Sequence, residues 1–444
     1  MVKEVSHIFP RNMNSILPTA VDAKGCYIYD SSGKAYLDAS GGAAVSCLGH
    51  AHQSVIRVLH RQLDELTYAH TSFFTSEQAE KLAERLCLKA PEGIDRVYLV
   101  SSGSEAVEAS LKLARQYYVE KGELDRKTII ARKQSYHGNT LGALAAGGNE
   151  WRRRQFSPLL INTHHIAPCF AYRGKNETED DFEYGQRVAN QLEEKLLELD
   201  PKSVMAFIAE PVVGATAGAV TAVDGYFRRI REICDEYGVL LILDEVMCGM
   251  GRTGYLYACE HDNIKPDILC IAKGLGAGYQ PIGAMLCTSE IYSTIENGSG
   301  FFQHGHTYLG HPMAAAASNA VLDVLLDQNL LTEVTPKGKI LEDLLKSKFN
   351  QHPHVGDIRG RGLFRAIELV GNRDTKVAFD PELKLAARIK KSAQENGLIC
   401  YPMSGTIDGK LGDHVLLAPP FTVSKNELDE LVEKLSVTIE QIIQ

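Results

Sequence analysis

Two apolar runs of strand length dominate the hydrophobic pattern of this chain. They cover residues 239–247 (VLLILDEVM) and 267–274 (DILCIAKG), and each run ends in charged residues. A run that is apolar on both faces is typical of a strand buried within a parallel sheet. The carboxyl ends of such strands lie at one edge of the sheet, where ligands bind. We therefore expect Asp244 and Lys273 to face one crevice.

In the rest of the central region, apolar runs typical of strands alternate with the apolar spacing typical of helices. Three further strands and two amphipathic helices are predicted, with the strands at residues 96–100, 128–132 and 204–213 and the helices at 105–120 and 225–237. Alternation of strands and helices is the signature of an α/β domain with a mainly parallel sheet.

The flanking regions follow a different pattern. Two short β-type runs surround a turn at 31–34, and two helices are expected at 52–66 and 76–90. The C-terminal third predicts strands within 355–370 and helices at 312–326, 331–349, 384–396 and 425–443. We divide the chain into an N-terminal segment (1–50) that joins the small domain, a large domain (51–328) and a small α+β domain (329–444).

An acid and an amine at one sheet edge suit pyridoxal phosphate (PLP). In PLP enzymes a lysine carries the aldehyde as a Schiff base and a carboxylate pairs with the pyridinium nitrogen. Lys273 follows the apolar stretch 268–272, so a buried position is expected. Burial lowers the pKa of a lysine, and the neutral amine is the form that attacks an aldehyde. A surface lysine beside a glycine loop is the alternative.

Two further motifs are compatible with cofactor binding, but each has a simpler explanation. The segment SSGSE at 101–105 lies between a strand and a helix, where free backbone amides bind phosphate. Ser102 and Glu105 also fit a capping box, which is the more common role. Tyr136 begins a YHG motif beyond the 128–132 strand. Its ring could stack on a flat cofactor, or it could simply pack in a loop.

Several function classes are disfavoured. The chain has 444 residues, a net charge of −9 and no basic block, which argues against nucleic acid and anionic membranes as partners. No Gly-Lys-Ser/Thr sequence accompanies Asp244 and Glu245, so a P-loop ATPase is not indicated. His304, His306 and His311 match no zinc spacing, and no metal is expected.

Cysteine usage and hydropathy indicate where the protein works. The ten cysteines are scattered and form no CxxC motif, which favours free thiols in a reducing cytoplasm. The N-terminus lacks an apolar signal core, and no apolar stretch is long enough to predict a membrane span.

Six motifs, taken in order, resemble those of the class III PLP-dependent aminotransferases. They are SGSEA (102–106), YHG (136–138), AEPV (209–212), LILDEV…GMGRTG (241–254), AKGLGAG (272–278) and HTYLGHP (306–312). Each motif is weak alone, but the ordered set is specific, and the resemblance extends from about residue 27 to residue 420. It implies fold type I of the PLP-dependent transferases and a homodimer with shared active sites.

The resemblance also assigns roles to individual residues. Lys273 would carry the cofactor and Asp244 would contact its ring nitrogen. Tyr136, next to His137, would stack on one ring face, and Val246 would pack on the other. Ser102, Gly103 and Ser104 would hold the phosphate. Thr307 would reach the cofactor of the neighbouring subunit. Glu210 and Ala44 would lie on the substrate side.

Three positions depart from the common pattern of this family. Met247 stands where many members have glutamine near the cofactor's 3′ oxygen. Leu416 stands where many members that use 2-oxoglutarate have an arginine, so Glu210 lacks its expected partner. Small residues fill 41–44, where some ω-amine enzymes have a tryptophan. We infer a roomy pocket that suits an amine distant from a carboxylate or an amine with no carboxylate at all, with pyruvate as the preferred acceptor over 2-oxoglutarate.

The sequence therefore favours an ω-type aminotransferase that transfers an amino group from an amine or ω-amino acid donor to a keto acid by a ping-pong mechanism. Two alternatives remain open. The same lysine and acid would serve a racemase, aminomutase or decarboxylase, because the bond that breaks depends on how the substrate is oriented. A non-catalytic protein with the same fold is the third hypothesis.

Overall fold

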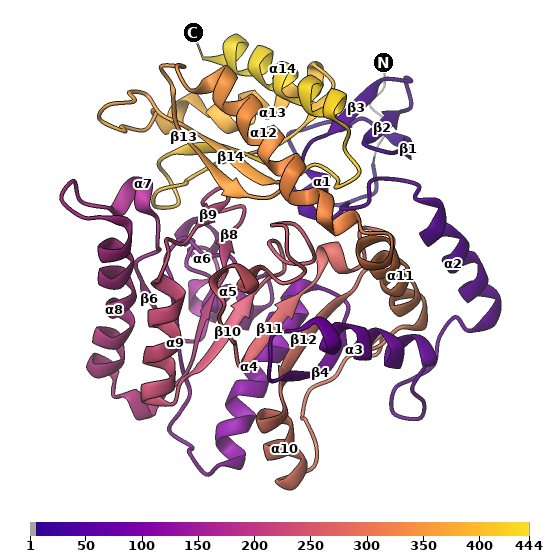
Figure 1. Ribbon diagram of the computed structural model, residues 1–444, viewed down its shortest axis with the longest axis vertical. Coiled ribbons are helices and arrows are strands. Elements are labelled where there is room, and N and C mark those ends of the chain that lie inside the picture. The colour runs from indigo at the N-terminus through magenta and orange to yellow at the C-terminus, as the bar shows by residue number, and fades with distance from the viewer. Residues whose placement is uncertain (1–5, 444) are drawn as a thin grey trace.

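A seven-stranded sheet runs through the centre of the computed structural model, which describes residues 6–443 (Figure 1). The strand order is β4-β12-β11-β10-β7-β5-β6. The strands are β4 (Ile94–Val100), β5 (Thr128–Arg132), β6 (Thr163–Ile166), β7 (Val204–Ala209), β10 (Leu240–Asp244), β11 (Ile268–Ile271) and β12 (Gly283–Thr288). β12 is antiparallel to both of its neighbours, and all other pairs are parallel. The expected mainly parallel sheet is confirmed.

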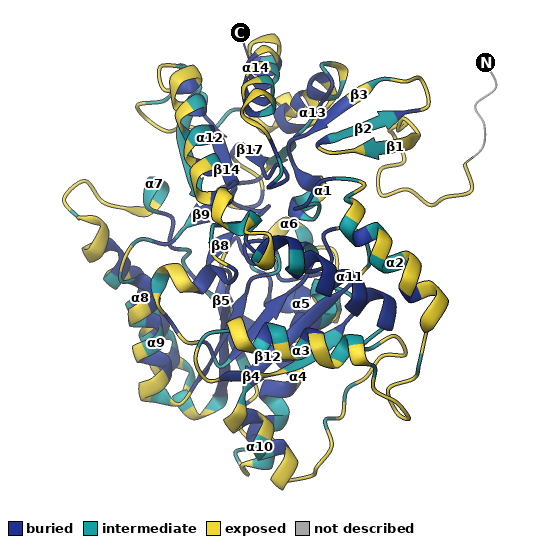
Figure 2. Cartoon of the chain, turned by 45° about the vertical axis from the view of Figure 1, so that its right-hand side comes forward, coloured by how far each residue is buried: buried dark blue, intermediate teal, exposed yellow. Residues whose placement is uncertain are grey.

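Both faces of this sheet are buried. Leu241 and Leu243 of β10 belong to the core cluster beneath α8 (Asp181–Leu199) and α9 (Tyr226–Tyr237), whereas Leu240 and Ile242 belong to the cluster beneath α4 (Gly103–Glu120). Because successive side chains of a strand point to opposite faces, a strand covered on both sides must be apolar throughout. Figure 2 shows the dark blue strands between helices whose outer faces are yellow.

Other helices complete the large part of the molecule. α2 and α3 both pack against α11. The bounds of these helices and of the shorter ones are α1 (Gly41–Ala44), α2 (Gln53–Glu65), α3 (Glu77–Lys89), α5 (Leu141–Ala146), α6 (Glu150–Arg153), α7 (Ala171–Gly174), α10 (Ser289–Asn297) and α11 (Pro312–Leu322).

The C-terminal part and the N-terminal strands lie together in Figure 1. An antiparallel sheet of order β13-β14-β17-β16 packs with three helices. Its elements are β13 (Val355–Arg361), β14 (Phe364–Leu369), β16 (Tyr401–Ser404), β17 (Asp413–Leu417), α12 (Val334–Phe349), α13 (Leu385–Glu395) and α14 (Lys425–Ile442). The second sheet contains β1 (Ala20–Lys24), β2 (Tyr27–Asp30), β3 (Ala35–Asp38) and β15 (Leu398–Ile399). β15 pairs in parallel with β3, so residues of the N-terminal segment share a sheet with the C-terminal part. The domain limits at 50/51 and 328/329 stay a prediction.

Some predicted elements differ from the observed ones. The strand expected at 204–213 breaks after Ala209, and β8 (Val212–Val213) pairs instead with β9 (Val220–Thr221). Pro211 interrupts the run because it has no N–H for a ladder hydrogen bond. The helix expected at 312–326 ends at Leu322 and continues as a π-helical turn, and the helix expected from 331 begins at 334 after a 3-10 turn. The sequence analysis missed β6, α8, β12 and α10.

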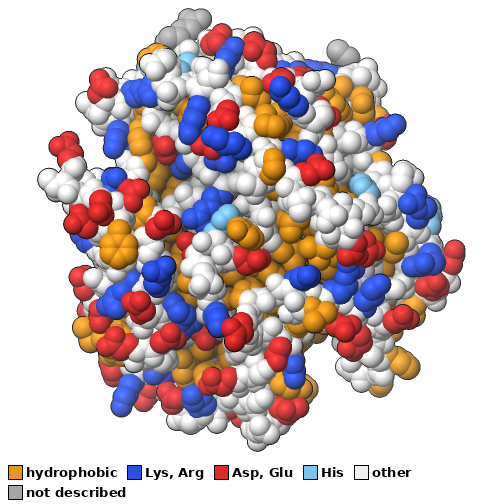
Figure 3. Space-filling view, viewed as in Figure 1, with side chains coloured by type: hydrophobic (Ala, Val, Ile, Leu, Met, Phe, Trp, Pro, Cys, Tyr) orange, Lys and Arg blue, Asp and Glu red, His pale blue; other side chains and the backbone are white. Residues whose placement is uncertain are grey.

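The surface carries both signs of charge. On the face shown in Figure 3, Lys and Arg side chains are interspersed with Asp and Glu. Within residues 6–443 no helix combines the length and hydropathy needed to cross a membrane.

Candidate active site

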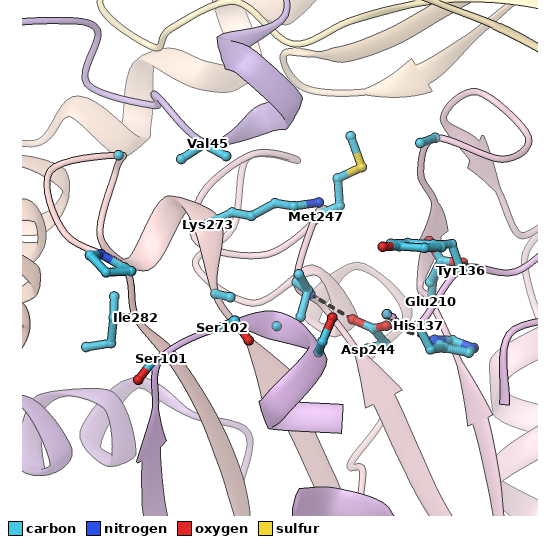
Figure 4. A pocket seen from close by; sticks show the side chains of 18 of the residues that line it. Val45, Ser101, Ser102, Tyr136, His137, Glu210, Asp244, Met247, Lys273 and Ile282 are labelled. Atoms are coloured by element: carbon cyan, nitrogen blue, oxygen red, sulfur yellow. Dashed lines mark hydrogen bonds and ion pairs between the residues drawn. The ribbon is translucent and has the colours of Figure 1, made fainter. Parts of the chain in front are cut away.

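The carboxyl ends of the central strands surround a cavity of about 490 Å³ (Figure 4). Segments that follow β4, β5, β7, β10 and β11 all contribute to its wall, as expected for a sheet whose strands point to one edge. Nine of the residues singled out from the sequence line this cavity, namely Ser102, Gly103, Ser104, Tyr136, His137, Glu210, Asp244, Val246 and Lys273.

Asp244 is held in one orientation at the end of β10. One carboxylate oxygen, Oδ2, lies 2.7 Å from Nδ1 of His137, and the other, Oδ1, accepts the Val246 N–H at 3.0 Å. Asp244 and His137 are only 3% and 2% exposed. An ionised carboxylate only accepts hydrogen bonds, so Nδ1 of His137 must carry the hydrogen. The cavity therefore contains a buried carboxylate in a fixed orientation.

Lys273 enters the same cavity from the first residue of a 3-10 turn (Lys273–Leu275) that follows β11. Its φ is +46°, a left-handed conformation that is uncommon for a residue with a side chain. Figure 4 shows its side chain extended across the pocket toward Met247. Burial lowers the pKa of Lys273 below its ordinary value, although Asp244 and Glu210 oppose this effect. More of the lysine is therefore present as the free amine than in solution.

The start of α4 forms one wall of the cavity. Ser102 caps this helix, because its Oγ accepts the Glu105 N–H at 3.2 Å. The Glu105 carboxylate accepts the Ser101 N–H at 2.7 Å, so it bonds one residue earlier than in the predicted capping box. The N–H groups of a first helical turn have no acceptor within the helix, and they favour an anion. Gly103 and Ser104 bring these groups to the cavity.

Two glycines allow the surrounding segments to approach this helix. A Cβ on Gly103 would lie 2.6 Å from Cγ1 of Val246. A Cβ on Gly138 would lie 2.7 Å from Oγ of Ser104, and the φ of Gly138 is +140°. Oγ of Ser104 also accepts the Asn139 N–H at 3.0 Å. The YHG segment is therefore in direct contact with the first turn of α4.

Glu210 is bonded by backbone amides rather than by an arginine. Its Oε1 accepts the Tyr136 N–H at 3.1 Å and its Oε2 accepts the Gly214 N–H at 2.9 Å. Burial raises the pKa of Glu210 above its usual value, with the nearby Asp244 adding to the effect. Leu416 is 1% exposed and belongs to an apolar cluster that includes Met247. The position at which the resemblance led us to look for an arginine is thus apolar in this chain.

Two of the predicted residues do not line the cavity. Ala44 is buried in the same cluster as Met247 and Leu416. Thr307 is exposed, and its carbonyl accepts the Tyr68 hydroxyl at 2.8 Å. A contact between Thr307 and a neighbouring subunit stays a prediction.

The cavity also contains residues that the sequence analysis missed. Val45 comes from the N-terminal segment, and no local pattern marks it. Residues 280–282 precede the antiparallel strand β12, which starts at the edge where the other strands end. Recognition of β12 would have found them. Across the described part of the chain, no group of three or more His, Cys, Asp or Glu side chains is arranged to hold a metal ion.

These groups fit PLP. The cofactor needs an amine for its aldehyde, an acid for its ring nitrogen, a donor-rich site for its phosphate and a narrow slot for its ring. Lys273, the Asp244–His137 pair and the start of α4 supply the first three. Tyr136 and Val246 line the cavity as flat and branched apolar surfaces for the ring.

Comparison with known proteins agrees with this geometry. The family model of the class III aminotransferases matches residues 8–439. An uncharacterized aminotransferase of Schizosaccharomyces pombe is 45% identical over 435 residues, which is 98% of this chain and 95% of that protein. The chain belongs to the class III aminotransferases, a PLP-dependent family.

Solved structures extend the agreement to the fold. An (S)-enantioselective omega-transaminase from Thermomicrobium roseum superposes with a TM-score of 0.92 at 32% identity, covering 99% of this chain and 97% of that one. The omega transaminase from Pseudomonas jessenii, solved in complex with PMP, gives a TM-score of 0.90 at 31% identity, covering 96% and 93%. The fold is therefore that of the fold type I PLP-dependent transaminases.

Proposed function

We propose that this aminotransferase binds PLP and moves the amino group of an amine or ω-amino acid to a keto acid, with pyruvate preferred over 2-oxoglutarate. The observation that carries this substrate class is the apolar character of one cavity wall. Val45, Ala215 and Met247 line the cavity, and Leu416 is buried in the cluster that contains Ala215 and Met247. This wall suits the apolar part of an amine, and a second carboxylate, as in 2-oxoglutarate, would be desolvated there without a partner.

The roles of the residues follow from their positions. When PLP is bound, it supplies an electron sink for the bonds at the substrate's Cα. The Asp244 carboxylate, oriented by His137, keeps a proton on the ring nitrogen. When PLP and a substrate amine are bound, the free amine of Lys273 would act as general base on the proton of the substrate's Cα and, as general acid, would deliver it to the cofactor carbon that carried the aldehyde. Burial lowers the pKa of Lys273, which favours the neutral amine that the first of these steps requires.

The amino group would pass in two half-reactions, so the kinetics should be of the ping-pong type. The donor leaves as a carbonyl product before the keto acid binds. Glu210 would lie on the substrate side, and its contacts with the Tyr136 and Gly214 amides hold it in the cavity wall.

We also propose a homodimer with shared active sites in a reducing cytoplasm. Phe73, Phe74 and Tyr308 are 80%, 67% and 60% exposed, and large exposed apolar side chains favour burial against a partner. Tyr308 follows Thr307, the residue we assign to the neighbouring cofactor. All ten cysteines are free, which supports a reducing compartment.

A donor panel tests the reaction directly. The purified protein, loaded with PLP, is mixed with β-alanine, 1-phenylethylamine or putrescine, and the visible absorbance is followed. Conversion to the pyridoxamine spectrum, reversed by pyruvate and more slowly by 2-oxoglutarate, is expected. If no donor produces this cycle, transamination is wrong. A product that forms without any keto acid would indicate a racemase, aminomutase or decarboxylase instead.

A further inference from the structure

Arg152 lies beside the cavity with an unused guanidinium group. Its Cζ is 4.6 Å from the centroid of the Tyr136 ring, and Tyr136 lines the cavity. Nε of Arg152 is buried and has no acceptor, and its side chain makes no ion pair or hydrogen bond within residues 6–443. A partly buried guanidinium without an acceptor is costly, since it forfeits hydrogen bonds to water. Such a group is suited to an acceptor that a ligand brings.

Three other arginines that are partly or fully buried do have hydrogen-bond or ion-pair partners. Arg153, the next residue, places its NH1 group 3.3 Å from Nδ1 of His165. Arg173 and Arg359 both form ion pairs with the buried carboxylate of Glu368. Arg152 therefore differs from these partly or fully buried arginines in having no acceptor.

The backbone around Arg152 is firmly anchored, so its position is defined by the fold. Oδ1 of Asn149 accepts the Arg152 N–H at 3.3 Å and caps the short helix α6. Nδ2 of Asn149 donates to Oε1 of Gln134 at 3.1 Å, and Nε2 of Gln134 donates to the Gly405 carbonyl at 2.5 Å. This chain of bonds ties Arg152 to the loop after β5 and to the C-terminal part of the molecule.

The charge of Arg152 reaches the reacting groups. It is one of the groups that lower the pKa of Lys273, although burial is the larger cause. It also acts to lower the pKa of Tyr136, against the larger effect of burial, which raises it. Among residues 6–443, the cavity wall has no basic side chain other than those of Lys273 and His137. Lys273 and His137 are committed to the chemistry and to Asp244. Arg152, which lies against Tyr136 beside the cavity, is a basic group that remains for an anionic part of the substrate.

We propose that Arg152 binds the carboxylate of the keto acid and so determines specificity for that substrate. The inference rests on the proposed function, in which the acceptor is a small keto acid. A guanidinium holds a carboxylate through two parallel N–H···O bonds, which give direction as well as energy. The carboxylate would lie on the Tyr136 side of the cavity, and the apolar remainder of the substrate would face Met247 and Ala215.

Steady-state kinetics with two acceptors test this assignment. Arg152→Gln and Arg152→Lys are compared with the wild type, with pyruvate as the charged acceptor and propanal as the uncharged one. For Arg152→Gln the KM for pyruvate should rise about 10- to 100-fold, as expected for the loss of a charge-assisted pair. The kcat/KM for propanal should stay within about twofold, and Arg152→Lys should recover part of the loss because it keeps a point charge.

Two other arginines serve as matched controls. Arg154→Gln removes the same charge two residues away from an exposed side chain, and it should leave the KM for pyruvate unchanged. Arg11 of the N-terminal segment also influences the pKa of Tyr136, so Arg11→Gln tests whether that arginine binds the carboxylate instead. An equal rise in KM for Arg154→Gln, or a larger one for Arg11→Gln, would overturn the assignment to Arg152.

Binding without turnover separates this inference from the proposed reaction. Propionate and propionamide have the same size but differ in charge, and each is titrated into the PLP-loaded protein by calorimetry. Propionate should bind more tightly than propionamide to the wild type, and Arg152→Gln should abolish the difference. If the wild type shows the difference but performs no transamination, only the proposed function fails. If Arg152→Gln retains the difference, the role of Arg152 is wrong.

Discussion

Replacing Gly103 by alanine tests how tightly the cavity is built around the cofactor. On helix propensity alone this change should stabilise the protein by up to about 1 kcal/mol, because glycine is a poor helix former. The structure predicts the opposite sign. The new Cβ would lie 2.6 Å and 3.0 Å from the two Cγ atoms of Val246 and 3.4 Å from its Cβ. Distances below 3.0 Å require one of the two segments to move.

Val246 cannot move without a cost. Its β-branched side chain is restricted at χ1, and its N–H donates to Oδ1 of Asp244 at 3.0 Å. Overpacking of this kind costs about 1–3 kcal/mol. After subtracting the helix-propensity gain, Gly103→Ala should lower the free energy of unfolding by up to about 2 kcal/mol. It should also weaken PLP binding, because the displacement reaches both the phosphate side and Asp244.

A double-mutant cycle isolates the clash from other effects. Val246→Ala removes both Cγ atoms, so Gly103→Ala should be neutral or stabilising by up to about 1 kcal/mol in that background. The coupling between the two positions should therefore be about 1–3 kcal/mol. The four proteins are compared by urea unfolding at one protein concentration, since any dimer would make stability depend on concentration.

Gly122→Ala is the matched control at the other end of α4. Gly122 has a φ of +76° and no atom within 4 Å of its Cβ position. This control should lose stability through its backbone conformation alone, and Val246→Ala should not rescue it. PLP affinity, measured by absorbance titration, should fall for Gly103→Ala and not for Gly122→Ala. Additive effects of Gly103→Ala and Val246→Ala would refute the packing that we describe.

Three further changes probe the chemistry and the pH dependence. Lys273→Ala should abolish the visible imine band of the PLP-loaded protein, and a band that persists would show that another amine carries the cofactor. Asp244→Asn should lower kcat at least about 100-fold, since it removes the carboxylate that His137 orients. Circular dichroism should show that the variant stays folded. A wild-type kcat in this variant would exclude a role for Asp244 at the ring nitrogen. Burial lowers the pKa of His414 to about 3, whereas the unfolded chain takes up that proton near pH 6.5. The free energy of unfolding should therefore fall as the pH drops from about 6.5 toward 3. Urea unfolding at several pH values should show a shallower fall for His414→Asn, and an unchanged slope would contradict this.

The sequence predicted most accurately the strands that are buried on both faces of the sheet. β10 and β11 are apolar throughout because helices cover both sides of the sheet, so their ends could be recognised, and with them Asp244 and Lys273. β12 is equally apolar, but a hydrophobic pattern does not record strand direction. Its antiparallel orientation brings residues 280–282 to the cavity, and these were missed.

Arg152 was missed for a different reason. It lies on a four-residue helix with no periodicity to detect, and its place beside Tyr136 depends on the contact between Gln134 and the Gly405 loop. Contacts of this kind join segments that are 271 residues apart. No local pattern could reveal them.

The two sides of the cavity differ in the amino-acid substitutions that they tolerate. On the phosphate side, backbones are in near contact: a Cβ on Gly283 would lie 2.5 Å from the Ser102 carbonyl oxygen, and a Cβ on Gly138 would lie 2.9 Å from Cα of Ser104. Backbone atoms cannot change rotamer, so substitutions there must disturb the cofactor site.

On the substrate side the wall consists of side chains from separate segments, including Val45, Ala215 and Met247. Each can be shortened without moving a strand end. Because Asp244, Lys273 and the start of α4 supply the groups that fit PLP, changes at Met247 or Arg152 should redirect substrate choice while PLP binding persists.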